Sequence, residues 1–97
     1  MDEFTFEWDA TKNLVNMRKH VVSFEEARTV FFDELGQVVR DPDHSIGEER
    51  FVLLGISELF RLIVVCFCER NKNTIRIISA RKDNRFERKH YEDNHHA

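Results

Sequence analysis

The 97-residue chain has few of the residues that interrupt or cross-link a fold, with one proline, three glycines and two cysteines. No proline- or glycine-rich linker is visible, and a chain this short has no room for two independent hydrophobic cores. No apolar run approaches the ~18 residues that a membrane-spanning helix needs, and the acidic N-terminus lacks the basic-then-apolar order of a secretory signal. We therefore expect residues 1–97 to form a single soluble, cytoplasmic domain.

Cysteine and histidine residues are too few and too poorly spaced to predict a metal or redox site. Cys66 and Cys68 lie two positions apart, so on a strand they would share one face, where a mutual disulfide would be strained. His95 and His96 belong to the C-terminal tail, and together with His90 they lack a rigid ligand spacing. We predict two reduced packing cysteines, no metal ion and no cofactor.

The net charge of −3 hides an asymmetry between the two parts of the chain. Residues 1–60 hold 13 acidic and 6 basic residues, whereas residues 61–97 hold 5 acidic and 9 basic residues. The basic part suits contact with a polyanion such as nucleic acid, and the acidic part suits a basic partner. The alternative is two solvated faces without a partner.

Three segments begin with a side chain that caps a helix. The predicted helices run from the cap at Asp9 to about His20, from a Ser23–Glu26 capping box to about Phe32, and from an Asn84–Glu87 capping box to about Glu92. Residues 93–97 follow the last helix as a His-rich tail that we expect to fray.

Between the second and third helices the sequence has a pattern typical of β-strands, with short runs of Val, Ile, Leu and Phe between turn residues. The predicted strands are residues 37–41, 50–57, 61–70 and 74–80. The connections at 58–60 and 71–73 are too short for crossover helices, so they predict antiparallel hairpins. The fold class is therefore α+β, with two N-terminal helices, a four-stranded antiparallel sheet and a C-terminal helix.

The turn at 71–73 predicts the register of the last two strands. The predicted pairs are Arg70 with Ile75, Glu69 with Arg76, and Cys66 with Ser79, which gives Arg76 a structural role. One face then carries apolar residues that we expect beneath the N-terminal helices, namely Ile63, Val65, Phe67, Ile78 and Ala80. The opposite face is more polar and is expected to be open, with Cys66, Cys68, Ser79 and Arg70.

The open face also collects candidate functional residues. The register of the preceding hairpin places Arg50 beside Cys68 and brings residues 42–49 to the same end of the sheet. The C-terminal helix, at ~1.5 Å per residue, is long enough to run back towards this end. We predict a constellation in which the following residues converge: His44, Glu49, Arg50, Arg70 and Tyr91.

Seven blocks follow one another along the chain. They are Phe6-Glu7-Trp8-Asp9, Lys19-His20, Ser23-Phe24-Glu25-Glu26-Ala27, Asp41-Pro42-Asp43-His44-Ser45, Glu48-Glu49-Arg50-Phe51, Ile75-Arg76-Ile77-Ile78-Ser79-Ala80-Arg81, and Glu87 with Tyr91. In this order they resemble the BrnT family of toxins from bacterial type II toxin-antitoxin systems. The resemblance covers nearly the whole chain.

The resemblance implies a RelE-like ribonuclease fold and RNA cleavage without a metal ion. It also implies neutralisation by a cognate antitoxin, usually with a ribbon-helix-helix DNA-binding domain, in a hetero-oligomer such as a 2:2 complex. DNA operator binding would then come only through the antitoxin. The chain departs from the family at Val21, where glycine is usual, at Asp33-Glu34 and at Lys82-Asp83-Asn84, and Val21 predicts a different junction between the first two helices.

RNA cleavage without a metal requires a base for the 2′-hydroxyl proton, cations for the charged phosphorane, and an acid or cation for the leaving oxygen. Arg50, Arg70 and Arg81 are candidate phosphate donors, because a guanidinium donates two parallel hydrogen bonds. Arg70 and Arg81 are too far apart along the sheet to hold one phosphate together. The alternative for Arg81 is an ion pair with Glu87.

The remaining candidates would transfer protons or contact a base. His44 is a candidate acid or base, because imidazole titrates near neutrality, or else it stabilises a turn. Glu49 is a candidate base, or else it pairs with Arg50. Tyr91 is a candidate to stack on a base or donate to phosphate, or else it packs in the core.

Two functions of different class follow from these residues. The first is a ribonuclease toxin that inhibits growth and translation and is neutralised by an antitoxin. The second is a non-catalytic protein-binding module that uses its acidic half to contact a basic partner.

Overall fold

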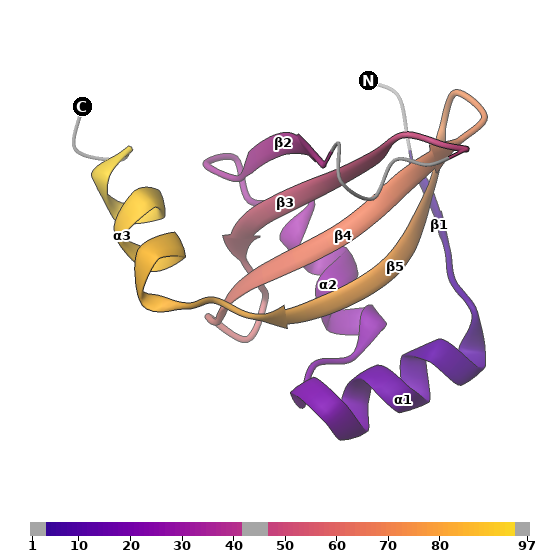
Figure 1. The fold of residues 1–97 in the computed structure, drawn as a ribbon, viewed down its shortest axis with the longest axis horizontal. Coiled ribbons are helices and arrows are strands. Elements are labelled where there is room, and N and C mark those ends of the chain that lie inside the picture. Colours follow the sequence, from indigo (N-terminus) through magenta and orange to yellow (C-terminus); the bar gives the residue numbers. More distant parts are fainter. Residues whose placement is uncertain (1–3, 42–46, 95–97) are drawn as a thin grey trace.

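A computed structural model describes residues 4–41 and 47–94 of the chain. In this part of the chain the elements are β1 (Thr5–Glu7), α1 (Ala10–His20), α2 (Phe24–Val30), β2 (Gln37–Asp41), β3 (Arg50–Ile56), β4 (Leu62–Arg70), β5 (Thr74–Lys82) and α3 (Arg85–Asp93) (Figure 1). None of the helices described is long and apolar enough to cross a membrane. The predicted α+β class and the order of the predicted elements are confirmed.

The strands form one sheet in the order β1-β5-β4-β3-β2 (Figure 1). Strands β2 to β5 are the predicted antiparallel strands. The sheet has one strand more than the predicted four, because β1 pairs in parallel with β5, with Glu7 opposite Arg76. This strand has only 3 residues and its partner lies far away in the sequence, so no local signal marks it.

Each helix begins at a capping side chain that the sequence predicts. Asp9 accepts from the Lys12 amide at 3.0 Å, and Asn84 and Glu87 form a complete capping box at α3. The box at Ser23 is only half formed, because the Glu26 carboxylate turns instead to other partners. Helix α2 also ends two residues earlier than predicted, since its last turn tightens into bonds of three-residue spacing.

The junction between α1 and α2 contains a left-handed residue, although that residue is a valine. Val21 has φ 58° and ψ 35°, and its amide donates to the Met17 carbonyl at 3.0 Å. A β-branched residue is strained in this conformation. Arg61 Nη2 donates to the Val21 carbonyl at 2.9 Å and helps to hold it. Val21 thus adopts the left-handed conformation for which valine is a poor residue.

Helices α1 and α2 lie together on one side of the sheet, and α3 stands apart from them beyond the end of β5 (Figure 1). The main core lies beneath α2, where Phe24, Ala27 and Val30 are 0% exposed. The strands supply the rest of this core, including Leu53, Ile63, Val65, Phe67, Ile77 and Ala80. A smaller cluster on the α3 side joins Leu54, Leu62 and Val64 to Tyr91. Most of the core positions predicted for β4 and β5 are thus confirmed.

The register of β4 and β5 changes at a β-bulge next to Cys66. Cys66 pairs with Ser79 as predicted, but after the bulge Phe67 pairs with Ile77 and Cys68 with Arg76. Ile77, at 1% exposure, therefore enters the core in place of the predicted Ile78. One extra residue on β5 accounts for this correction.

Candidate functional site

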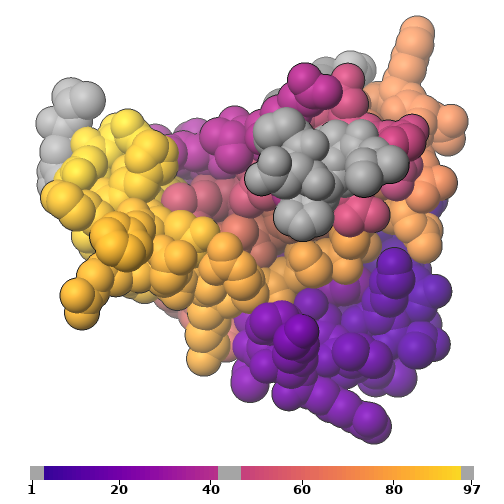
Figure 2. Space-filling view, in the orientation of Figure 1, coloured from indigo at the N-terminus to yellow at the C-terminus, as the bar shows by residue number. Residues whose placement is uncertain are grey.

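The open face of the sheet carries a groove of 300 Å³. Figure 2 shows this face, with β5 crossing its centre and α3 at one side. The groove is lined by residues of four neighbouring strands: Asp41 of β2, Arg50 and Val52 of β3, Val64 and Cys66 of β4, and Ile78, Ser79 and Arg81 of β5. We call it the arginine groove, because it brings together two of the predicted phosphate donors, Arg50 and Arg81.

Arg81 is oriented by Glu87, the residue that also completes the capping box of α3. Its two terminal nitrogens donate to Glu87 Oε1 and Oε2 at 2.9 and 2.7 Å. These hydrogen bonds raise the pKa of Arg81 and lower the pKa of Glu87. The Arg81 side chain keeps 43% exposure, so a phosphate in the groove meets a guanidinium whose direction is already set.

Arg50 lies on β3 opposite Cys68, as predicted, and on its other side opposite Asp41. Arg81 lies opposite Val64 on β4, four residues from Cys68, so the two arginines are about 13 Å apart along the strands. They flank β4 and are therefore also about 10 Å apart across it, which makes their backbone positions roughly 16 Å apart. Two extended guanidinium side chains can therefore contact one RNA segment.

Both cysteines are free thiols in the structure. Cys68 is 0% exposed, whereas Cys66 lines the arginine groove. Burial raises the pKa of the Cys66 thiol, and the charge of Arg50 offsets part of that rise. Cys66 therefore stays protonated near neutral pH and acts as a packing residue.

Arg70 and Arg76 do not line the arginine groove. Arg70 Nε lies 3.5 Å from Glu48 Oε2, at the far end of β4. Arg76 donates to Glu7 Oε2 at 2.8 Å, so the predicted pair with Glu69 is wrong. The bulge places Glu69 opposite Ile75 and Arg70 opposite Thr74, so the predicted pair of Arg70 with Ile75 is wrong as well. Arg76 lies beside the unpredicted strand β1.

Tyr91 does not approach Arg70. It is 7% exposed and packs against Leu54, Leu62 and Val64. Its hydroxyl donates to Asp33 Oδ2 at 2.5 Å, and burial together with this carboxylate raises the pKa of Tyr91. The predicted convergence is wrong for this residue, because α3 crosses the sheet near Leu54 instead of running back along it.

Of the two proton-transfer candidates, the structure describes only Glu49, which does not line the arginine groove. Glu49 pairs with Arg40 at 3.5 Å and not with Arg50, and both partners are exposed. His44 lies outside the described residues. Among residues 4–41 and 47–94, no three His, Cys, Asp or Glu side chains lie close enough to share a metal ion.

Of the polar groove residues, sequence reasoning placed Ser79 on the open face but missed Asp41. Asp41 ends β2 opposite Arg50, and Ser79 follows the bulge opposite Cys66. The pairing of Ser79 with Cys66 was predicted, whereas no register was predicted between residues 37–41 and 50–57, so there was no reason in the sequence to place Asp41 opposite Arg50. The groove can therefore bind an anion through Arg50 and Arg81, while Asp41 and Ser79 add polar groups at its wall.

Comparison with known proteins gives two findings. The family model described as the ribonuclease toxin BrnT of type II toxin-antitoxin systems matches residues 8–87. The chain belongs to this BrnT family. The crystal structure of the Brucella abortus ribonuclease toxin BrnT has a similar fold, with a TM-score of 0.66 and 19% identity over 84% of this chain and 99% of that one. A search of curated proteins finds no match.

The BrnT match includes every arginine of the open face and ends at Glu87, before Tyr91. Ribonuclease activity and an antitoxin partner are properties of this family as it is described. The arginine groove thus lies within the part of the chain that defines membership of the BrnT family.

Proposed function

We propose that this BrnT chain is an endoribonuclease that cleaves RNA without a metal ion. The observation that carries the proposal is the arginine groove, in which Arg50 and Arg81 line one cleft on the open face of a BrnT fold. Both guanidinium groups donate hydrogen bonds with the geometry that a phosphate accepts. Developing charge on a phosphorane in the groove would therefore meet Arg50 together with Arg81, whose guanidinium Glu87 already orients.

The proposed reaction uses the 2′-oxygen of the RNA as the nucleophile. A base removes the 2′-hydroxyl proton, the 2′-oxygen bonds to the adjacent phosphorus, and the bond to the 5′-oxygen breaks as an acid protonates that oxygen. In this scheme Arg50 and Arg81 stabilise the phosphorane and Arg70 positions the RNA strand. His44, three residues after the groove residue Asp41 in the sequence, is the proposed proton carrier, with Glu49 as the second candidate.

The proposed partner is an antitoxin that carries a ribbon-helix-helix DNA-binding domain and forms a hetero-oligomer such as a 2:2 complex. In that complex only the antitoxin would contact a DNA operator. We propose a cytoplasmic location, where translated RNA is available to a growth-inhibiting toxin.

A second candidate function is the non-catalytic protein-binding module. The observation that favours it is that three arginines of the open face carry carboxylate partners, in the pairs Arg70–Glu48, Arg76–Glu7 and Arg81–Glu87. An exposed pair such as Arg70–Glu48 is weak, at about 0–1 kcal/mol, so a phosphate can replace its carboxylate, whereas the two-bond, partly buried pair Arg81–Glu87 stays in place and orients its guanidinium. Competition between carboxylate and phosphate is thus compatible with the ribonuclease function.

Expression of the chain alone is expected to arrest bacterial growth and to shorten cellular RNA, and coexpression of its antitoxin is expected to restore growth. The measurement is colony formation together with RNA sequencing of cleavage ends. Arg85→Ala, an exposed arginine of α3 outside the arginine groove, is the matched control and should arrest growth like the parent chain. Normal growth with abundant soluble protein and intact RNA would support the binding module instead.

RNA binding is expected to weaken steeply with salt, because the phosphate contacts come from arginine side chains. For three phosphate contacts, affinity for single-stranded RNA should fall about 20-fold between 50 and 200 mM salt. The measurement is fluorescence anisotropy with a 2′-O-methyl oligonucleotide, which has no free 2′-hydroxyl to attack. A flat affinity over this range would argue against electrostatic binding in the groove.

A further inference from the structure

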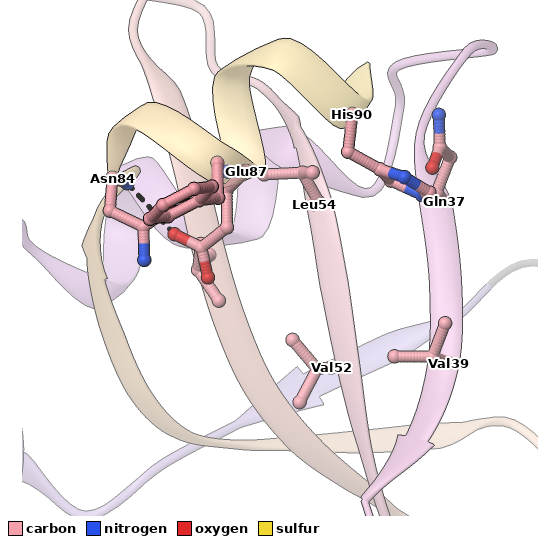
Figure 3. Close-up of a pocket in the computed structure, with 9 residues that line it drawn as sticks. Gln37, Val39, Val52, Leu54, Asn84, Glu87 and His90 are labelled. Atoms are coloured by element: carbon pink, nitrogen blue, oxygen red, sulfur yellow. Dashed lines mark hydrogen bonds between the residues drawn. The ribbon is translucent and has the colours of Figure 1, made fainter. Parts of the chain in front are cut away.

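A second pocket of 300 Å³ lies next to the arginine groove, between α3 and the open face of the sheet. Its floor is apolar and includes Val39, Val52 and Leu54, which Figure 3 shows beneath α3. Val52 and Val64 line both this pocket and the arginine groove. The ion pair between Glu87 of the pocket and Arg81 of the groove also joins the two cavities. They therefore form one continuous depression.

The side chains at the wall of the pocket are of the kinds that bind a planar heterocycle. Phe86 of α3 lines the pocket and is 79% exposed, so its ring is accessible to a ligand. Gln37 and His90 lie at one end and Asn84 and Glu87 at the other (Figure 3). Asn94 Nδ2 donates to Gln37 Oε1 at 3.0 Å and lies 3.2 Å from His90 Nε2, so the polar end is held in place.

We propose that this pocket binds the nucleobase next to the phosphate held by Arg50 and Arg81, and that it sets the base preference of the enzyme. The inference rests on the proposed ribonuclease function and adds the subsite that reads the RNA. Phe86 stacks on the face of the base, the valine floor contacts its other side, and Gln37 and His90 hydrogen-bond to its edge. RNA is read in this manner by aromatic stacking and edge contacts to unpaired bases.

The position of the pocket favours a nucleotide over a protein segment. A volume of 300 Å³ is at the small end of the ~300–1,000 Å³ typical of small-molecule sites. The adjoining guanidinium groups supply the positive charge that the phosphate of a nucleotide needs, and they lie on the same depression. The alternative is that a segment of the antitoxin binds in the pocket, and the test must distinguish this from nucleotide binding.

The direct test is a titration of the full chain followed by NMR of methyl groups. The ligands are the four nucleoside 3′-monophosphates and, as the base-free probe, ribose 5-phosphate. The expected result is that at least one nucleotide shifts the methyl signals of Val39 and Leu54, which line only the base pocket, whereas ribose 5-phosphate shifts only signals near Arg50 and Arg81, including Val52. Equal shifts from nucleotides and from ribose 5-phosphate would overturn the base pocket while leaving the phosphate site intact.

A variant tests the same subsite in the cleavage reaction. Phe86→Ala is expected to lower the preference between bases at the cleavage site about tenfold, mainly through KM, since base–aromatic stacking has this magnitude. For an RNA with an abasic residue at that position, Phe86→Ala and the parent chain should cleave at the same rate. Phe60→Ala is the matched control, because Phe60 is 88% exposed and lines neither cavity.

These experiments separate failure of the subsite from failure of the proposed function. If the chain cleaves RNA but Phe86→Ala keeps the full base preference, the subsite proposal falls and the ribonuclease function stands. If no RNA is cut but nucleotides still shift the pocket methyl signals, the pocket binds bases and the catalytic proposal fails. Shifts caused by the antitoxin and by no nucleotide would overturn the proposal and assign the pocket to the antitoxin.

Discussion

Replacing Arg81 by alanine is expected to lower the rate of RNA cleavage by roughly 100- to 1,000-fold, because loss of one oriented donor to a transition-state anion costs about 2.7–4 kcal/mol of barrier. The fold should survive. Arg81 is 43% exposed, and the capping hydrogen bond from the Asn84 amide to the Glu87 carboxylate, at 2.8 Å, does not involve it. Single-turnover cleavage of a short RNA, with a thermal melt of the same sample, measures both effects.

Arg70 and Arg76 provide the comparisons that make the Arg81 result specific. Arg70 is about 20 Å along the sheet from Arg81, so Arg70→Ala should weaken RNA binding and raise KM more than it lowers the rate of the bound RNA. Arg76 pairs with Glu7 on β1, so Arg76→Ala should cost at most about 1 kcal/mol of stability with little loss of rate. Loss of turnover in Arg76→Ala at an unchanged melting temperature, with normal cleavage by the other two variants, would refute the assignment.

The helices and hairpins were predictable because their signals are local. A capping side chain satisfies amides two or three residues away, and a short connection forces its two strands to be antiparallel. Asp9 and Asn84 therefore marked helix starts that the structure confirms. The same logic placed Arg50 opposite Cys68, since the turn between β3 and β4 sets that register.

The errors arose where a contact depends on distant parts of the chain. Strand β1 pairs with β5 across nearly 70 residues of sequence, and neither strand contains a signal for the other. The β-bulge adds a single residue to β5, which changes the face of every residue between it and the turn. Both the unpredicted strand and the bulge change the surroundings of Arg76, so its partner is Glu7 and not Glu69.

In the candidate site, too, the positions set by local signals were predictable and those set by distant contacts were not. Arg50 and Arg81 lie in strands whose pairing the hairpins determine, and they share a groove. The position of Tyr91 depends on the angle at which α3 leaves the sheet, and that angle is set by packing against Leu54 and by the bond to Asp33. The amphipathic pattern of a helix predicts which face is buried and not where the helix lies.

Replacing Arg61 by methionine is expected to destabilise the fold by about 3–5 kcal/mol, because it leaves a buried carboxylate without its cation. Glu26 is 4% exposed in the ion pair, and Arg61 Nε donates to its Oε2 at 2.9 Å. Ser57 Oγ donates to the same oxygen at 2.6 Å. Urea unfolding at neutral pH measures the loss.

Matched variants distinguish this network from an ordinary surface pair. Lys89→Met removes the exposed pair with Asp93, whose side chains are 76% and 61% exposed, and should cost less than about 1 kcal/mol. The double variant Glu26→Gln with Arg61→Met should recover part of the lost stability, because no unpaired charge remains. A single Arg61→Met variant as stable as the parent would show that Glu26 is hydrated despite its burial.

The contribution of Glu26 to the pH dependence of stability should have opposite signs in the parent and in Arg61→Met. Burial alone would raise the pKa of Glu26, but hydrogen bonds from Arg61 and Ser57 outweigh it and lower that pKa below the usual value of about 4.3. In the folded parent Glu26 therefore stays ionised, and its contribution is present above pH 4.3 and is lost as pH falls through the lower folded pKa. Without Arg61, burial raises the pKa, so acid should relieve the penalty and the stability contributed by Glu26 should rise on going from pH 7 towards pH 5. Unfolding free energies from pH 3 to 7, compared with those of Lys89→Met, give the difference, and parallel curves for Arg61→Met and the parent would remove Glu26 as the titrating group.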